Sequence, residues 1–277
     1  MNPQFFGQSD KPLFGVYHRA RGSNVTPVRA AVICPPIGQE YVRTHWCLRL
    51  LAGQLSRQGI HVFRFDYTGI GDSAKSIFDV KSLEQWNTDI ELASNQVKEH
   101  SGADSVMLIG LRTGATLAAN YSLTSNDVNS LMLWEPVHQQ KNHLDQWRSL
   151  HQQMLDLWIC KMVTENNDQC EEILGSQYSR LLIDQLESVE IQWDKIQQPH
   201  FVFEINESNW PANFDPNAMC KVAFTDDEDS WVDLRQMETA WMRPQTTRKI
   251  VSSAVDTFER LVRFGILNES KVTGVAR

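Results

Sequence analysis

The chain lacks several features that would assign it to a membrane or to nucleic acid. Its 277 residues contain no run of about 18 apolar residues, so we expect no membrane-spanning helix. The N-terminus has no cationic segment followed by an apolar one, which predicts no signal peptide. The formal net charge of -8 argues against non-specific nucleic-acid binding, because no basic face neutralises phosphates.

Cysteine is scarce and scattered. The five cysteines form no C-x-x-C pair and no Cys/His cluster with zinc-ligand spacing. We therefore predict no metal and no cofactor, and we expect reduced thiols in a cytoplasmic protein. Histidine is unevenly distributed, since none of the eight histidines follows His200.

Apolar strand patterns alternate with helical patterns over the first half of the chain. The predicted strands are 28–34, 60–65, 105–109 and 130–134, and the predicted helices between them are 44–58, 83–99 and 115–120. This alternation predicts an α/β fold with a mostly parallel, doubly wound sheet. In such sheets ligands bind beyond the carboxyl ends of the strands.

The pattern changes after His138. Residues 139–190 contain no convincing strand, and Leu150, Met154 and Leu157 have helical spacing. We predict a helical cap insertion over 139–194 and a core formed by 1–138 and 195–277. In the core's second part we expect strands at 200–205 and 221–224 and a helix over 246–264.

Residues 110–114 read Gly-Leu-Arg-Thr-Gly between a predicted strand and a predicted helix. A strand, a glycine-bounded turn and a helix form the setting of the G-x-S-x-G nucleophile elbow, but Arg112 stands at the central position. Guanidinium stays protonated in proteins and has no acceptor atom, so it cannot attack a carbonyl.

Four stretches resemble the α/β-hydrolase superfamily, particularly the serine-aminopeptidase-like group and the exosortase-A-system-associated hydrolases. They are Pro-Pro-Ile-Gly-Gln-Glu-Tyr-Val-Arg (35–43), Arg-Phe-Asp-Tyr-Thr-Gly-Ile-Gly-Asp-Ser (64–73), Gly-Leu-Arg-Thr-Gly-Ala (110–115) and Trp-Glu-Pro-Val (134–137). The resemblance implies the α/β-hydrolase fold and a catalytic order of Ser, acid, His.

Two of these three catalytic roles have no matching residue. Arg112 occupies the serine position, and the loop expected to carry the histidine, 225–246, contains none. Acids remain, at Asp226, Asp227, Glu228, Asp229 and Glu135. Ser73 and Cys34 are possible replacement nucleophiles, which we interpret as a turn serine and a buried thiol. We predict that ordinary serine hydrolysis does not occur and leave other enzymatic activity open.

The elbow still places a helix N-terminus at the site, where N–H groups favour an anion. A second donor is expected from the loop 36–38, as in an oxyanion hole. We predict that an anionic or acyl-bearing small molecule is bound by Arg112, Thr113, Ile37, Gly38, Gln39 and Glu135. The alternative is that Arg112 forms an internal ion pair with Glu40, Glu135 or Asp66, since a buried guanidinium needs a partner.

Three function classes remain open from the sequence. The chain is an inactive hydrolase homologue that binds a small molecule or a biosynthetic partner protein, an enzyme with a non-standard acyl-transfer or lyase mechanism, or a hydrolase with a displaced nucleophile.

Overall fold

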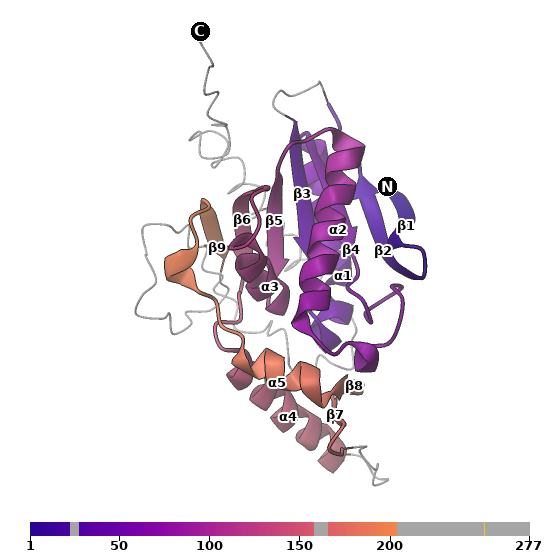
Figure 1. Cartoon of the computed structure of the whole chain (residues 1–277), viewed down its shortest axis with the longest axis vertical. Coiled ribbons are helices and arrows are strands. Elements are labelled where there is room, and N and C mark those ends of the chain that lie inside the picture. Colours follow the sequence, from indigo (N-terminus) through magenta and orange to yellow (C-terminus); the bar gives the residue numbers. More distant parts are fainter. Residues whose placement is uncertain (23–27, 158–165, 204–251, 253–277) are drawn as a thin grey trace.

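The structure, a computed structural model, describes residues 1–22, 28–157, 166–203 and 252 (Figure 1). Seven strands form one sheet in the order β1-β2-β4-β3-β5-β6-β9. Their bounds are β1 Asn2–Gln8, β2 Lys11–His18, β3 Arg29–Cys34, β4 Ile60–Phe65, β5 Val106–Leu111, β6 Val128–Trp134 and β9 His200–Phe203. The predicted strand 221–224, the helix 246–264 and the acids at 226–229 lie outside the described residues.

The prediction of a mostly parallel sheet is confirmed. Strands β4, β3, β5, β6 and β9 are parallel neighbours, while β1 and β2 add an antiparallel hairpin beside β4. The five predicted strands that fall in the described residues are all present. No strand was predicted before residue 28, so the hairpin of β1 and β2 is known only from the structure.

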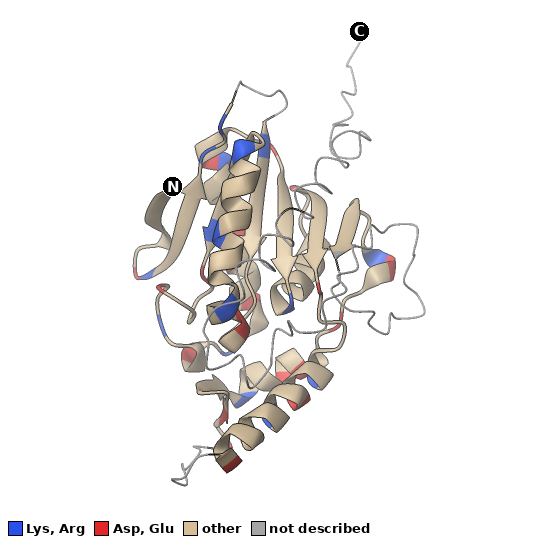
Figure 2. Ribbon diagram, turned by 180° about the vertical axis from the view of Figure 1, so that it is seen from behind, with Lys and Arg blue, Asp and Glu red and all other residues tan. Residues whose placement is uncertain are grey.

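Three helices cover the two faces of the sheet: α1 Gly38–Arg57, α2 Leu83–Ser101 and α3 Thr113–Ser122. Leu48, Leu51 and Leu55 of α1 pack with Ile33 and Ile109 in one apolar cluster. The other face forms a second cluster with α2 and α3, which Figure 1 shows in front of the sheet. Charged side chains are concentrated on the helices and loops, whereas most of the sheet is uncharged (Figure 2).

The strand order reverses beside β3. The chain leaves β3 through α1 on one face and leaves β5 through α3 on the other, and β3 and β5 are paired neighbours. A crevice opens at the carboxyl ends of two such strands, and ligands of α/β sheets bind there. This position is occupied by the segment after Cys34 and by Arg112.

The start of α1 differs from the prediction. The sequence placed a loop at 35–41 and a helix from 44, but α1 begins at Gly38. The segment 38–41 has no apolar periodicity that would identify it as helix. Its buried residue is Glu40, a charged side chain in the first turn of α1 that is 0% exposed. Gly38 and Gln39 are therefore helical residues.

The segment after β6 contains two helices, α4 Gln140–Leu157 and α5 Arg180–Ser188, and a short hairpin between them. The hairpin strands are β7 Cys170–Ile173 and β8 Ser176–Ser179, so the prediction of no strand in 139–190 is wrong. Four-residue strands are too short to show an alternating pattern, and their positions follow from packing. Two single-turn 3-10 helices lie at Ile77–Asp79 and Trp193–Lys195.

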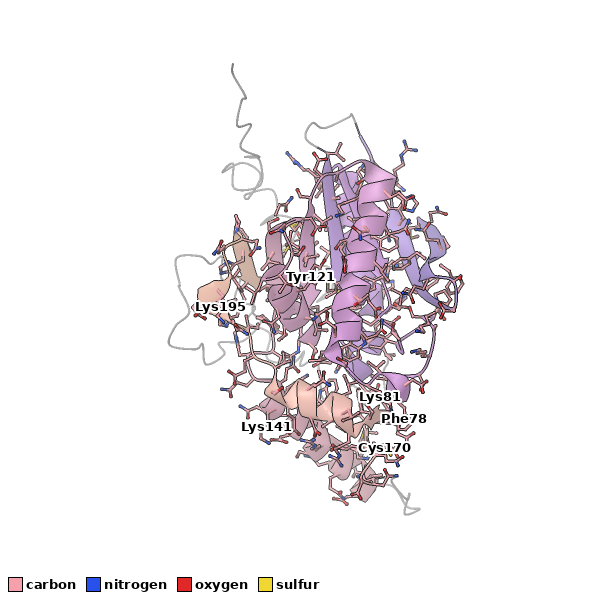
Figure 3. The ribbon with its side chains drawn as sticks, in the orientation of Figure 1. Phe78, Lys81, Tyr121, Lys141, Cys170 and Lys195 are labelled. Atoms are coloured by element: carbon pink, nitrogen blue, oxygen red, sulfur yellow. The ribbon has the colours of Figure 1, made fainter. Side chains whose placement is uncertain are left out.

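Figure 1 shows α4, α5 and the hairpin below the sheet. The hairpin end is fastened to the segment before α2, since Ser179 Oγ donates to the Val80 carbonyl at 2.6 Å. Figure 3 shows Phe78 and Lys81 of that segment next to Cys170 of the hairpin. Among the described residues, no helix has the length and apolar character needed to cross a membrane.

Candidate functional site

Arg112 lies at a strained turn between β5 and α3. Its backbone has φ 54° and ψ -124°, a conformation that non-glycine residues rarely adopt. Its N–H donates to the Trp134 carbonyl at 2.9 Å, which holds the turn against β6. A sharp strained turn from strand to helix is the geometry of a nucleophile elbow.

The glycines on both sides of Arg112 are required by close packing. A Cβ on Gly110 would lie 2.3 Å from Ala115 Cα, and one on Gly114 would lie 2.3 Å from the carbonyl oxygens of Cys34 and Pro35. The start of α3 therefore packs directly against the end of β3. This contact brings the elbow and the segment 35–37 together, as the sequence predicted.

Arg112 is paired with an internal carboxylate. Its Nε lies 3.1 Å from Oε1 of Glu40, and the side chains are 19% and 0% exposed. The guanidinium also contacts the Glu135 carbonyl through Nη1 and His143 Nδ1 through Nη2, both at 3.4 Å. Glu40, one of the acids proposed as internal partners, therefore pairs with Arg112. Asp66 instead accepts from Tyr41 Oη at 2.7 Å.

His143 joins this pair from α4. Its Nε2 lies 3.4 Å from Oε1 of Glu40, and its side chain is 4% exposed. Arg112, Glu40 and His143 thus form a polar cluster from three elements, which we call the elbow cluster. Burial alone would raise the pKa of Glu40, but the charge of Arg112 and the contacts with His143 outweigh it and lower the pKa to about 2.

The depressed pKa of Glu40 predicts a pH dependence of stability. A carboxyl group whose pKa falls from 4.5 in a free side chain to about 2 in the fold stabilises the fold fully above pH 4.5. That contribution is lost as the pH falls toward 2. We expect the stability difference between the wild type and Glu40→Gln, measured by urea unfolding, to be constant above pH 5 and to shrink below pH 4. A difference that does not change with pH would contradict an ionised Glu40.

The other predicted site residues surround the elbow cluster with different roles. Thr113 is buried and its hydroxyl donates to Gln140 Oε1 at 3.4 Å. Gln39 donates through Nε2 to the Leu174 carbonyl of the hairpin turn at 2.9 Å. Ile37 is buried as the N-cap of α1, and Gly38 lies under Tyr178 and Trp147. Several of these residues therefore hold α4 and the hairpin against the core.

The two replacement nucleophiles have structural roles. Ser73 Oγ accepts from the Phe14 N–H at 2.8 Å and donates to the Asp66 carbonyl at 2.6 Å, as a turn serine does. Cys34 is fully buried, and burial raises the pKa of its thiol to about 12. A thiolate is the reactive form of cysteine, so neither residue is a prepared nucleophile here.

Sequence reasoning did not assign His143 to the site. Gln140, His143, Leu144 and Trp147 are the buried residues of α4, and their spacing puts them on one helix face. A histidine and a glutamine on an otherwise apolar face were the available signal. Within the described part of the chain, no group of three His, Cys, Asp or Glu residues could hold a metal ion.

The family model described as "Serine aminopeptidase, S33" matches residues 37–189, more than half of the chain. The chain belongs to the serine aminopeptidase S33 family. The matched segment starts at the N-cap of α1, includes the elbow and ends just after α5, so it contains the whole elbow cluster. No protein of curated function is significantly similar to the chain in sequence.

Solved structures of this superfamily share the fold. Est1E from Butyrivibrio proteoclasticus, solved with ferulic acid bound, has a TM-score of 0.63 at 11% identity, with 94% of this chain and 99% of that chain covered. A putative hydrolase from Agrobacterium vitis S4 has a TM-score of 0.53 at 14% identity, with 96% and 98% covered. At these identities the likeness establishes the α/β-hydrolase fold alone.

Proposed function

We propose that this chain is a member of its family without serine hydrolase chemistry, in which Arg112 stands where the nucleophile is expected. Its function is to bind an acyl-bearing or anionic small molecule, or a partner protein of a biosynthetic pathway, at the elbow. The observation that carries the proposal is the ion pair of 3.1 Å between Arg112 and Glu40 at the strained turn. A side chain engaged in this way is neither a nucleophile nor a base.

The ion pair between Arg112 and Glu40 also affects which ligand groups would bind at the elbow. Glu40 neutralises the charge of Arg112, so a second carboxylate at the elbow gains less than it would from an isolated guanidinium. In the first turn of α3 the N–H groups of Ala115 and Thr116 donate to the Arg112 carbonyl, so those of Thr113 and Gly114 are the ones that would favour a polarised oxygen. We therefore propose an acyl carbonyl, held against Thr113 and the segment 35–37, over a free carboxylate. Residues 139–194 would act as the cap over this ligand.

The test combines activity and binding. We expect no labelling by a fluorophosphonate and no hydrolysis of activated esters above the buffer rate. We expect butyryl-N-acetylcysteamine, a small acyl thioester, to raise the Tm of the wild type, and free butyrate to raise it less. Arg112→Ala should reduce the shift caused by the thioester, measured against its own unliganded Tm. Labelling of any serine would contradict the proposal.

A second candidate is an enzyme of non-standard mechanism, such as an acyl transfer or lyase step. The observation that favours it is the imidazole of His143 within 3.4 Å of both Arg112 and Glu40. Consumption of the thioester without fluorophosphonate labelling, lost in His143→Gln, would favour this candidate over a binding protein.

A further inference from the structure

Three enclosed polar atoms beside the elbow have no hydrogen-bond partner of acceptable geometry in the described part of the chain. They are Glu40 Oε2, Trp147 Nε1 and the Tyr178 hydroxyl, on side chains that are at most 1% exposed. Buried polar atoms in native proteins are normally paired, and each unpaired one costs about 1–3 kcal/mol. A ligand that supplies hydrogen-bond partners to these three atoms would remove that cost.

These atoms belong to one cluster of side chains around the first turn of α1. A Cβ on Gly38 would lie 2.7 Å from the Tyr178 hydroxyl and 2.9 Å from the Trp147 ring. The Trp147 ring centroid lies 4.7 Å from that of His143, which contacts Glu40. Burial raises the pKa of Tyr178, the nearby Ser176 hydroxyl opposes this, and the charge of Glu40 raises the pKa further. The core supplies the carboxylate and the cap segment supplies the two aromatic donors.

The chemistry of the three atoms defines what they can bind. An ionised Glu40 only accepts hydrogen bonds, the Trp147 indole only donates, and the Tyr178 hydroxyl does both. A ligand carboxylate would be repelled by Glu40, and an ammonium would leave the indole N–H without an acceptor. An uncharged group that both donates and accepts, a hydroxyl or an amide, satisfies all three.

We propose that Glu40, Trp147 and Tyr178 form a subsite for a hydroxyl or amide group on the acyl ligand of the elbow. This inference rests on the proposed function and adds a substrate class to it: acyl groups with an uncharged polar substituent. The subsite lies between α1 and the cap segment, so a ligand that fills it connects the two parts.

The test uses butyryl-N-acetylcysteamine and its monohydroxylated derivatives, with Kd measured by calorimetry. One hydroxylated derivative should bind the wild type about tenfold more tightly than the parent, the effect of one buried hydrogen bond. Tyr178→Phe should remove this preference. The unliganded variant should keep a Tm close to that of the wild type, since the hydroxyl it loses is fully buried and has no hydrogen bond of good geometry.

Tyr41→Phe is the matched control, because its hydroxyl is already bonded to Asp66 at 2.7 Å. It should lose stability and keep the preference for the hydroxylated probe. If Tyr178→Phe weakens all the probes equally, the subsite binds their shared amide. If it weakens none of the probes that bind, the subsite is overturned and the elbow site stands. If no probe binds the wild type, both proposals fail.

Discussion

Gly114→Ala is expected to prevent the chain from folding, with a loss of at least about 4 kcal/mol in the free energy of unfolding. A Cβ there would lie 2.3 Å from two backbone carbonyl oxygens, those of Cys34 and Pro35. Backbone at the end of a central strand cannot move aside as a flexible side chain can. The measurement is urea unfolding followed by circular dichroism, or the yield of soluble protein when no folded variant is recovered.

Gly53→Ala is the matched control for this substitution. Gly53 lies within α1, and a Cβ there would have no atom within 4 Å. Alanine in a helix interior is preferred over glycine by about 0.5–1 kcal/mol, so this variant should be slightly more stable than the wild type. Equal stability of the two alanine variants would show that the elbow does not pack against β3 as described.

Glu40→Gln is expected to lower the free energy of unfolding by about 3 kcal/mol at pH 7. The carboxylate is fully buried and the Arg112 side chain is 19% exposed, so the substitution breaks this ion pair in a largely enclosed site. Glutamine keeps the shape of the side chain and one carbonyl acceptor, so the lost stability would come from the missing negative charge. Chemical denaturation of the purified variant measures it.

Two further variants test whether the loss comes from the ion pair. Glu40→Gln combined with Arg112→Met should recover more than about 1 kcal/mol relative to additivity, because the guanidinium that faced the Glu40 carboxylate is removed together with it. Lys141, labelled in Figure 3, forms an exposed pair with Asp145 at 3.3 Å. Lys141→Met should change stability by less than about 0.5 kcal/mol. A comparable loss in both single variants would argue against a special role for Glu40.

Local patterns in the sequence were sufficient to predict the central strands of the sheet. Strand β4 was predicted at 60–65 and found there, and β3, β5 and β6 start or end within two residues of the prediction. These strands are central and mostly buried, so most of their residues are apolar. The hairpin of β7 and β8 and the first turn of α1 were missed, because their positions are set by contacts with distant residues.

The sequence by itself determined that the central residue of the elbow cannot attack a carbonyl, because the identity of a side chain decides its chemistry. It also indicated that a buried Arg112 needs an acidic partner, with Glu40, Glu135 and Asp66 as candidates. Only the tertiary structure selected Glu40, since α1 begins early enough to turn that carboxylate toward the elbow. It also brought His143, Trp147 and Tyr178 to the same place. Residues separated by more than a hundred positions meet because parallel strands end at one edge and the chain after β6 folds back across it.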